Sequence, residues 1–442
     1  MYLCNYSIRI KVDNGSTYLK PNIFVLYTTH RSEMKKPNKR KIINDPVFGF
    51  INIPNDLLYD IIQHPYFQRL GRIKQLGLTS TVYPGAQHTR LQHSLGAMHL
   101  MGEAIAQLRQ EGHSISTLED EGARAAILLH DIGHGPFSHA MENSLVSGVS
   151  HEEISLWMME KINAELGGKL DIALSIFTNN YHKKYLHQLV SSQLDMDRLD
   201  YLSRDSFFSG VSEGIIGAAR IIKMLNIHND QLVVEAKGIY SIEKFLVARR
   251  LMYWQVYLHK TSVAAEKMLL SILKRAKELA SKKVKLFASP ALHYFLYNEV
   301  NKQNFMHSNS ALENFAMLDD SDIICAIKVW STHDDVVLAT LCKAFTDRRL
   351  FKVEIIPEPI SDEKRQAQLK LYVEHFGISI KEATYFLGEE IVSTDTYTPQ
   401  DDNINILYKD GSIKDIADAS DMLNITVLTK KVEKHYFCYF KI

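Results

Sequence analysis

The chain has 442 residues, of which 46% are hydrophobic and 23% are charged, and its formal net charge is zero. This length is enough for a large core and for two domains, while the balanced charge gives no support to a general nucleic-acid-binding or anionic-membrane surface. No apolar run has the length of a transmembrane helix, the start lacks a secretory apolar segment, and four cysteines without a CxxC pair favour a reducing cytoplasm.

Residues 1–45 are the first predicted unit, an N-terminal extension that is either flexible or a mis-called start. Residues 1–33 show little helical period, and Met34 opens the lysine-rich stretch MKKPNKRKIINDP, which is typical of a chain start. We therefore expect translation to begin at Met34, and an intact mass that includes residues 1–33 would contradict this.

Residues 46–285 are predicted to form a mostly helical catalytic core. From Asn55 onward, apolar residues recur at three- and four-residue spacing, with turns at Pro84-Gly85, Gly148 and Gly167-Gly168. Inside this core, residues 231–236 and 238–240 alternate between polar and apolar and predict a short hairpin.

The most informative segment is AILLHDIGHGPFSH, residues 126–139, where an apolar helical run ends in the pair His130-Asp131. The spacing from His130 to His134 predicts two imidazole rings on one helix face. Neutral imidazole together with carboxylate suits a mid-series divalent ion. A catalytic metal centre is therefore the leading hypothesis.

A His-Asp pair alone is weak evidence, because a second one at His333-Asp334 is expected to lie in a solvated loop. The first pair differs in its surroundings. A buried run, residues 127–129, precedes it, and Gly133 and Gly135 follow it and bring backbone close to whatever is bound.

Two further segments carry groups that a metal site needs. YPGAQHTRLQHS, residues 83–94, has Arg90 and His93 at the start of a helical pattern. In QLDMDRLDYLSRDSFFSG, residues 193–210, one helix face carries Asp197, Tyr201 and Asp205, with Asp200 on its flank. The alternative interpretation of this second stripe is a salt-bridged surface helix.

Residues 286–442 are predicted to form an α+β region. Helices continue to about Leu350, a strand begins at Phe351, and a charged helix covers residues 361–376. Further strands are predicted in ATYFLGEEIVS and HYFCYF, and Asp410-Gly411 is a strong hairpin signal.

Taken together, these segments resemble the HD-domain phosphohydrolases, and most closely the deoxynucleoside triphosphate triphosphohydrolases. The match runs from about Phe48 to Lys260 and is carried by FQRLGRIKQLG, YPGAQHTRLQHSLG, HDIGHGPFSH, SHEE, DMDRLDYLSRD and an R-x7-Y-x-H-K run. The resemblance implies a mostly α fold, with a helical HD-domain catalytic core and a smaller α+β C-terminal appendage.

The resemblance also implies one divalent metal ion and a reaction. The ligands would be His93, His130, Asp131 and Asp197, with Mn, Mg, Fe, Zn and Ni all open as the metal. Relatives cleave deoxynucleoside triphosphates (dNTPs) at the α-phosphate and release deoxynucleoside and triphosphate. The alternatives are an HD-domain enzyme for another nucleotide phosphoester, such as a monophosphate or signalling nucleotide, and a nucleic-acid-binding protein with a vestigial site.

The leaving 5′ oxygen needs a proton, for which a histidine is the natural donor. The candidates are His134, His139 and His151, with Glu142 as an orienting carboxylate for the last. His151 has an alternative interpretation as an N-terminal helix residue, because Ser150 and the following glutamates look like a capping region.

For the substrate, the resemblance implies contacts from several side chains. Arg90, Arg198 and Arg249 would bind the phosphates. Gln75 and Asp205 would lie near the 3′ hydroxyl, and Tyr201 would lie against the 2′ carbon. Tyr257 would line the base pocket, although core packing explains its aromatic stripe equally well.

The family's C-terminal appendages commonly support oligomers and nucleotide control, so we expect a homo-oligomer, a dimer or tetramer, and leave a nucleotide effector open. In regulated relatives an Asp and an Arg recognise an activating guanine nucleotide. The aligned positions here are Gln63 and Gly71, with only Gln68 retained, so GTP activation in that manner is not expected. No membrane partner is expected.

Overall fold

The structure is a computed structural model of the chain. It describes residues 41–137, 141, 144–146, 148–394, 397, 403–421 and 432–442. The proposed start at Met34 and most of the predicted extension lie outside these residues. So do two of the predicted catalytic residues, His139 and Glu142.

The helices from the start of the described chain to residue 281 are α1 Asp56–Gln63, α2 Pro65–Gln68, α3 Arg90–Gln110, α4 Thr117–Leu129, α6 His151–Glu165, α7 Asp171–Phe177, α8 Lys184–Val190, α9 Met196–Ser209, α10 Ala218–Lys223, α11 Ile239–Met252 and α12 Lys260–Ser281. They are followed by α13 Pro290–Tyr297, α14 Lys302–His307, α15 Asn309–Met317, α16 Asp320–Trp330, α17 Val336–Thr346, α18 Asp362–Phe376, α19 Ile380–Ala383 and α20 Ile416–Ala419.

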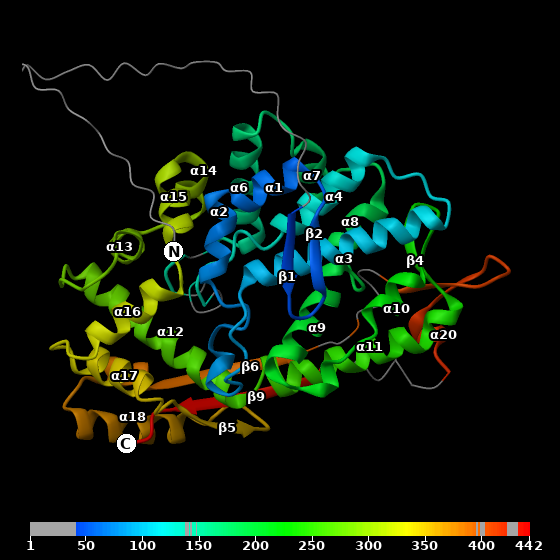
Figure 1. The fold of residues 1–442 in the computed structure, drawn as a ribbon. Helices are drawn as coiled ribbons and strands as arrows, with labels where there is room; N and C mark the ends of the chain where they lie inside the picture. The colour runs from blue at the N-terminus through cyan, green and yellow to red at the C-terminus, as the bar shows by residue number, and fades with distance from the viewer. Residues whose placement is uncertain are drawn as a thin grey trace, which may run out of the picture. The chain divides into compact units, whose positions relative to one another are not determined.

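The strands are β1 Lys41–Asp45, β2 Gly49–Ile53, β3 Leu225–His228, β4 Gln231–Glu235, β5 Lys352–Ile356, β6 Leu387–Thr394, β7 Asn405–Leu407, β8 Ile413–Asp415 and β9 Val432–Tyr439. Helices dominate, and most strands lie in the C-terminal part of the chain (Figure 1). The predicted fold class, mostly α with a smaller α+β C-terminal region, is confirmed.

Helix α3 is the central element of the core. It begins at a capping box, in which the Thr89 backbone N–H donates to the Gln92 side chain. Residues 97, 98, 101, 104 and 105 are fully buried along its length. The helix packs against α4 and α9, and these three helices supply the residues of the candidate site.

Helix α4 begins at a second capping box, formed by Ser116 and Glu119, and ends at Leu129. His130 is the residue at its C-terminal cap, and the chain then turns. The prediction that His130 and His134 share one helix face is therefore wrong. Gly133, in the turn that follows, lies close against α6: a Cβ atom there would lie 2.2 Å from the carbonyl oxygen of His151, so this position requires glycine.

The prediction that residues 231–236 and 238–240 pair as a hairpin is also wrong, because the first of these segments pairs with a different strand. Strand β4 pairs antiparallel with β3, which precedes it, whereas residues 239–252 form helix α11. The connecting turn is Asn229-Asp230, and both residues have positive φ, 49° and 61°. This conformation is the one that a two-residue hairpin turn requires, and Asn and Asp tolerate it better than most residues.

The C-terminal region contains the predicted strands and charged helix. Strand β9 lies between β5 and β6 in an antiparallel sheet, and α12 packs against this sheet. Helix α18 lies beside the same sheet (Figure 1), where the buried Tyr372 donates a hydrogen bond to the Phe440 carbonyl.

The hairpin signal at Asp410-Gly411 is confirmed by β7 and β8. Strand β7 also pairs in parallel with β4, so the C-terminal hairpin extends the β3–β4 hairpin of the helical core. In the part of the chain that the structure describes, no helix is both long enough and apolar enough to cross a membrane.

Candidate functional site

Three side chains from three different helices converge on one point. His93 lies in the first turn of α3, His130 caps α4, and Asp197 lies in the first turn of α9. The Nε2 atoms of His93 and His130 are 3.3 Å apart, and Asp197 Oδ1 is 3.0 Å from the first and 3.5 Å from the second. These donor atoms are close enough to bind a single metal ion.

The contacts of Nδ1 in each of the two rings show that Nε2 is the nitrogen that can bind a metal. His93 Nδ1 lies 2.7 Å from Asp200 Oδ2, and His130 Nδ1 lies 2.6 Å from the Ile127 carbonyl oxygen. A carbonyl and an ionised carboxylate only accept, so both Nδ1 atoms carry hydrogen. In neutral imidazole this leaves the Nε2 lone pairs facing each other, which is the arrangement of a metal-binding histidine pair.

The fourth predicted ligand, Asp131, lies at the edge of this cluster. Its Oδ1 is 3.4 Å from His130 Nε2 and its Oδ2 is 3.8 Å from His93 Nε2. The same carboxylate accepts a 2.5 Å hydrogen bond from Arg90 and lies 3.2 Å from His134 Nε2. Asp131 thus connects the metal cluster to a cation and to one of the predicted proton donors.

The electrostatics of the cluster favour a positive charge. Burial alone would lower the pKa of His93, but its hydrogen bonds to Asp197 and Asp200 outweigh burial and raise that pKa to about 10. Burial would likewise raise the pKa of Asp197, and the two histidines instead lower it. Two imidazoles and two carboxylates at these distances fit a divalent cation, which would take the place of the protons.

His134 and His151 stack on one another next to the cluster. Their ring centroids are 3.9 Å apart with an interplanar angle of 18°. Burial, followed by the charge of Arg90, lowers the pKa of His134 to about 3. The prediction that Ser150 caps the helix starting at His151 is confirmed by a complete capping box with Glu153.

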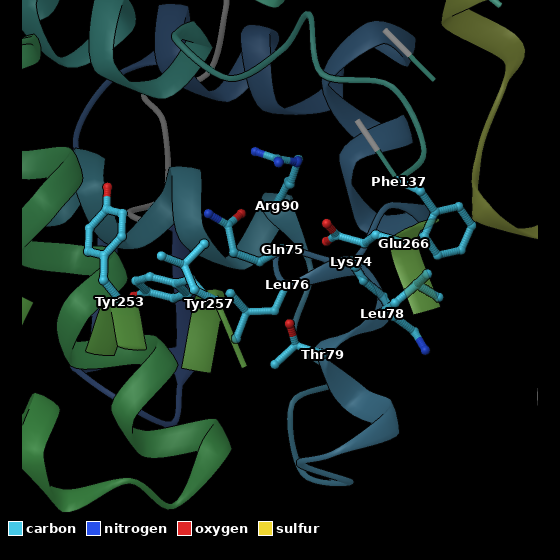
Figure 2. A pocket seen from close by; sticks show the side chains of 12 residues that line it. Lys74, Gln75, Leu76, Leu78, Thr79, Arg90, Phe137, Tyr253, Tyr257 and Glu266 are labelled. Atoms are coloured by element: carbon cyan, nitrogen blue, oxygen red, sulfur yellow. The ribbon is translucent and has the colours of Figure 1, made fainter. Parts of the chain in front are cut away.

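Figure 2 shows the residues that line a cavity of about 310 Å³, and one of them, Arg90, connects the cavity to the cluster through its hydrogen bond to Asp131. Three of the predicted substrate-binding residues, Gln75, Arg90 and Tyr257, line it. Two buried polar atoms of these residues, Gln75 Oε1 and Arg90 Nε, have no hydrogen-bond partner within the described chain. Buried polar atoms are normally paired, and these two unpaired atoms belong to residues that line the cavity.

Tyr201 and Asp205 lie on α9 and are linked to this cavity through Tyr257. Tyr257 donates a 2.8 Å hydrogen bond to Asp205 Oδ2, and the Tyr201 ring contacts the Tyr257 ring edge-on at 6.1 Å. Asp205 Oδ1 lies 2.7 Å from His88 Nε2. Tyr257 is therefore part of a polar network as well as part of an aromatic cluster.

The three predicted phosphate-binding arginines have different hydrogen-bond partners. Arg90 contacts Asp131, whereas Arg249 donates to Gln193 Oε1 and has a buried Nε without a partner among the described residues. Arg198 donates to the Ser192 carbonyl, pairs with Asp195 and lines a separate polar cavity of about 460 Å³.

The structure adds residues that the sequence prediction did not assign to the site. Asp200 orients His93, and His88 holds Asp205. The fully buried Arg69 donates to the carbonyls of Ile132 and His134 and so holds the loop after the His-Asp pair. The available signals were weak: Asp200 stood out only as the flank of a stripe, and Arg69 is one of several basic residues in FQRLGRIKQLG.

Comparison with protein families gives two matches. Residues 90–205 match the model of the HD domain, and residues 216–292 match that of the HD associated region. The first range begins at Arg90 and ends at Asp205, so it contains the whole metal cluster.

Similar proteins include a structure titled as a phosphohydrolase from Bacteroides thetaiotaomicron, which is 62% identical with a TM-score of 0.89 and covers 91% of this chain and 100% of its own. An uncharacterized protein from Bacillus subtilis is 32% identical over 92% of this chain and 93% of its own. A deoxynucleoside triphosphate triphosphohydrolase homolog from Dictyostelium discoideum is 33% identical over 52% of this chain and 48% of its own.

Proposed function

Because the chain belongs to the HD-domain phosphohydrolases, a family of metal-dependent hydrolases, we propose that it hydrolyses dNTPs to deoxynucleoside and triphosphate. The observation that carries the proposal is the group of metal-ligand residues together with the cavity that Gln75, Arg90 and Tyr257 line, which Arg90 connects to that group by its hydrogen bond to Asp131. A site for a simple phosphomonoester would not need this second set of groups. The Dictyostelium relative, a deoxynucleoside triphosphate triphosphohydrolase homolog, supports the same substrate class.

His93, His130, Asp131 and Asp197 would hold the divalent ion. When bound, the ion supplies Lewis-acid stabilisation of phosphate charge and activation of water. Asp200 and the Ile127 carbonyl keep both imidazoles in the tautomer that the ion needs.

Arg90, Arg198 and Arg249 would neutralise the triphosphate. Arg90 is nearest to the cluster through Asp131, which suits contact with the phosphate next to the reacting bond. The free Nε of Arg249 adds a donor, and the position of Arg198 on the same helix as Asp197 suits the distal phosphates.

We assign the proton donor for the leaving 5′ oxygen to the stacked pair His134 and His151. Burial and the charge of Arg90 lower the pKa of His134, and the anionic triphosphate would favour its protonated form. His139 and Glu142 keep their predicted catalytic roles, which concern positions outside the described residues.

The sugar contacts give a reason for a deoxyribose. We assign the 3′ hydroxyl to Gln75 and Asp205, and the 2′ carbon to the ring of Tyr201. Tyr201 packs against Tyr257, so its ring has little freedom to move away from an added 2′ hydroxyl, which would also remain unpaired.

Three further properties of the protein stay predictions. It is expected to form a homo-oligomer and to lie in the cytoplasm. A nucleotide effector is open, although activation by GTP in the manner of the regulated relatives is not expected. The balanced charge of the chain supports none of the nucleic-acid alternatives directly.

The decisive experiment is ion-exchange analysis of the products after incubation with Mn or Mg and each dNTP, singly and mixed. NTPs and deoxynucleoside monophosphates serve as competing substrates, and the Asp197→Asn variant serves as the inactive control. We expect deoxynucleoside and intact triphosphate. Orthophosphate from monophosphates, with every dNTP left intact, would transfer the assignment to another nucleotide phosphoester.

A further inference from the structure

Glu266 is a carboxylate in the wall of the candidate substrate cavity. It lies on α12 and lines the same cavity as Gln75 and Tyr257, although the metal cluster does not include it. Figure 2 shows its carboxylate pointing into the cavity from the side opposite Tyr257. Leu76, Leu78 and Phe137 line the cavity near it.

Within the described chain this carboxylate has no hydrogen-bond or ion-pair partner. The one charge that acts on it is that of the adjacent Lys267, and Lys267 itself forms an ion pair with Glu390 on β6. Burial raises the pKa of Glu266 to about 7. The side chain is half-buried at the cavity wall, and partly desolvated carboxylates without donors are concentrated at binding sites.

The proposed function determines which part of the substrate reaches Glu266. If the phosphates lie at the cluster and the sugar lies at Gln75 and Tyr201, the base occupies the remainder of the cavity. The apolar side chains of Leu76, Leu78 and Phe137 suit the flat faces of a base, and Glu266 then meets its polar edge.

The bases differ in what that edge offers to two carboxylate oxygens. Guanine presents two adjacent donors, N1–H and the 2-amino group. Adenine and cytosine present one amino group beside a ring-nitrogen acceptor, and thymine presents one N–H between two carbonyls. Only guanine can give both oxygens of an ionised carboxylate a hydrogen bond without placing an acceptor against them.

We propose that Glu266 is a specificity residue of the proposed dNTP hydrolase, and that it selects dGTP by accepting two hydrogen bonds from guanine. This inference rests on the proposed function. It assigns the base preference to a residue of α12, which contributes nothing to the metal cluster.

The test is kcat/KM for all four dNTPs in the full chain and in Glu266→Gln. The substitution keeps the shape and removes one acceptor, so we expect kcat/KM for dGTP to fall about 10- to 100-fold. An amide can accept from an amino group and donate to a ring nitrogen, so dATP and dCTP should hold their values or improve. Glu374→Gln, an exposed position on α18 without a described partner, is the matched control and should leave all four values unchanged.

Three results would overturn the inference while leaving the proposed function intact. The first is a wild-type enzyme without a preference for dGTP. The other two are a kcat/KM that falls equally for all four dNTPs in Glu266→Gln, or a kcat/KM that does not fall for any of them. If Glu266→Gln does not fold, Glu266→Asp keeps the charge and should keep the order of preference with a lower kcat/KM for dGTP. Calorimetric binding of each dNTP to metal-depleted protein makes the same comparison without turnover. A different result would overturn only the proposed reaction: the wild type does not turn over any dNTP, but it binds dGTP selectively and Glu266→Gln loses that selectivity.

Discussion

At the scale of single residues, the site depends on groups that hold the ligands as much as on the ligands. His93 would bind the ion through Nε2, while its Nδ1 hydrogen is held by Asp200, which is fully buried. Asp200 is in turn held by two hydrogen bonds from Arg204, and Arg204 pairs with Asp45 on β1. The orientation of one imidazole thus depends on a buried chain of charges that reaches the first described strand.

We predict that Asp200→Asn weakens metal binding about 10- to 100-fold, because the amide no longer fixes the His93 tautomer. The measurement is metal content by mass spectrometry, together with calorimetric titration of Mn into the metal-depleted protein. Asp362→Asn, an exposed position on α18, is the control and should bind metal like the unchanged protein. Undiminished affinity in Asp200→Asn would rule out the positioning role.

His93 and His130 could be singled out from sequence because their chemistry is local, whereas Asp197 was assigned as a ligand through the family resemblance. A His-Asp pair at the end of an apolar run and a helix start with an arginine and a histidine are visible in the chain itself. The partner of each ring is not visible in this way, because Asp200 is 107 residues from His93. Only the packing of α3 on α9 brings these two residues into contact.

At the scale of elements, the distance between α3 and α9 sets the geometry of the cluster. Gly96 faces α9 where the two helices meet: a Cβ atom there would lie 1.9 Å from Asp200 Oδ1 and 2.2 Å from Arg204 Nη2. Both neighbours are fully buried and hydrogen-bonded, so neither can move aside easily.

We predict that Gly96→Ala lowers the free energy of unfolding by about 1–3 kcal/mol, the usual cost of overpacking, and also reduces metal content. Thermal unfolding and metal analysis measure the two effects. Gly71→Ala is the matched control, because its new Cβ would meet Leu91 at an ordinary 3.5 Å. Equal unfolding midpoints in the two variants would show that the helices tolerate a wider separation.

The helices themselves were predictable because their signals are local, as the capping boxes at Ser116 and Ser150 illustrate. Two element-scale predictions failed for one physical reason. The stretch 231–236 has the alternation of a strand, but alternation does not say which neighbour pairs with it. Likewise, the spacing of His130 and His134 matches a helix, but spacing does not say where the helix ends, and α4 ends at Leu129.

At the scale of the whole molecule, a buried network around Arg275 on α12 connects distant parts of the chain. The Arg275 guanidinium binds Glu278 on the same helix, Asp335 before α17 and Glu382 on α19. Burial alone would raise the pKa of Glu278, but hydrogen bonds from Lys282, Tyr385 and Arg275 outweigh burial and lower that pKa to about 2.

We predict that Glu278→Gln lowers the free energy of unfolding at neutral pH by on the order of 2 kcal/mol. The pKa of Glu278 is lower in the folded protein than the ordinary 4.5, so its ionised form stabilises the fold above that ordinary value. The stabilisation is lost as pH falls toward the folded value. Urea unfolding should therefore show a difference in the free energy of unfolding between wild type and variant that is constant from pH 8 to about 5 and becomes smaller below pH 5.

Glu374→Gln is the matched control. Its free energy of unfolding should equal that of the wild type at every pH, since the side chain is exposed. A gap for Glu278→Gln that stays constant down to pH 3 would mean that neutral hydrogen bonding, rather than the charge, stabilises the network.

Local sequence patterns were enough to predict the helical fold class, the α+β character of the C-terminal region, the hairpin at Asp410-Gly411 and the segments that carry His93, His130 and Asp197. Each of these depends on periodicity, turn chemistry or residue type within a short stretch of chain. The packing of distant elements, in contrast, sets the pairing of β4 with β3 and β7, the stacking of His134 on His151, and the position of Glu266 in the cavity wall. Such features depend on which elements pack together. They could not be predicted from sequence, because a contact between two elements far apart in the chain leaves no periodic pattern in the sequence of either element.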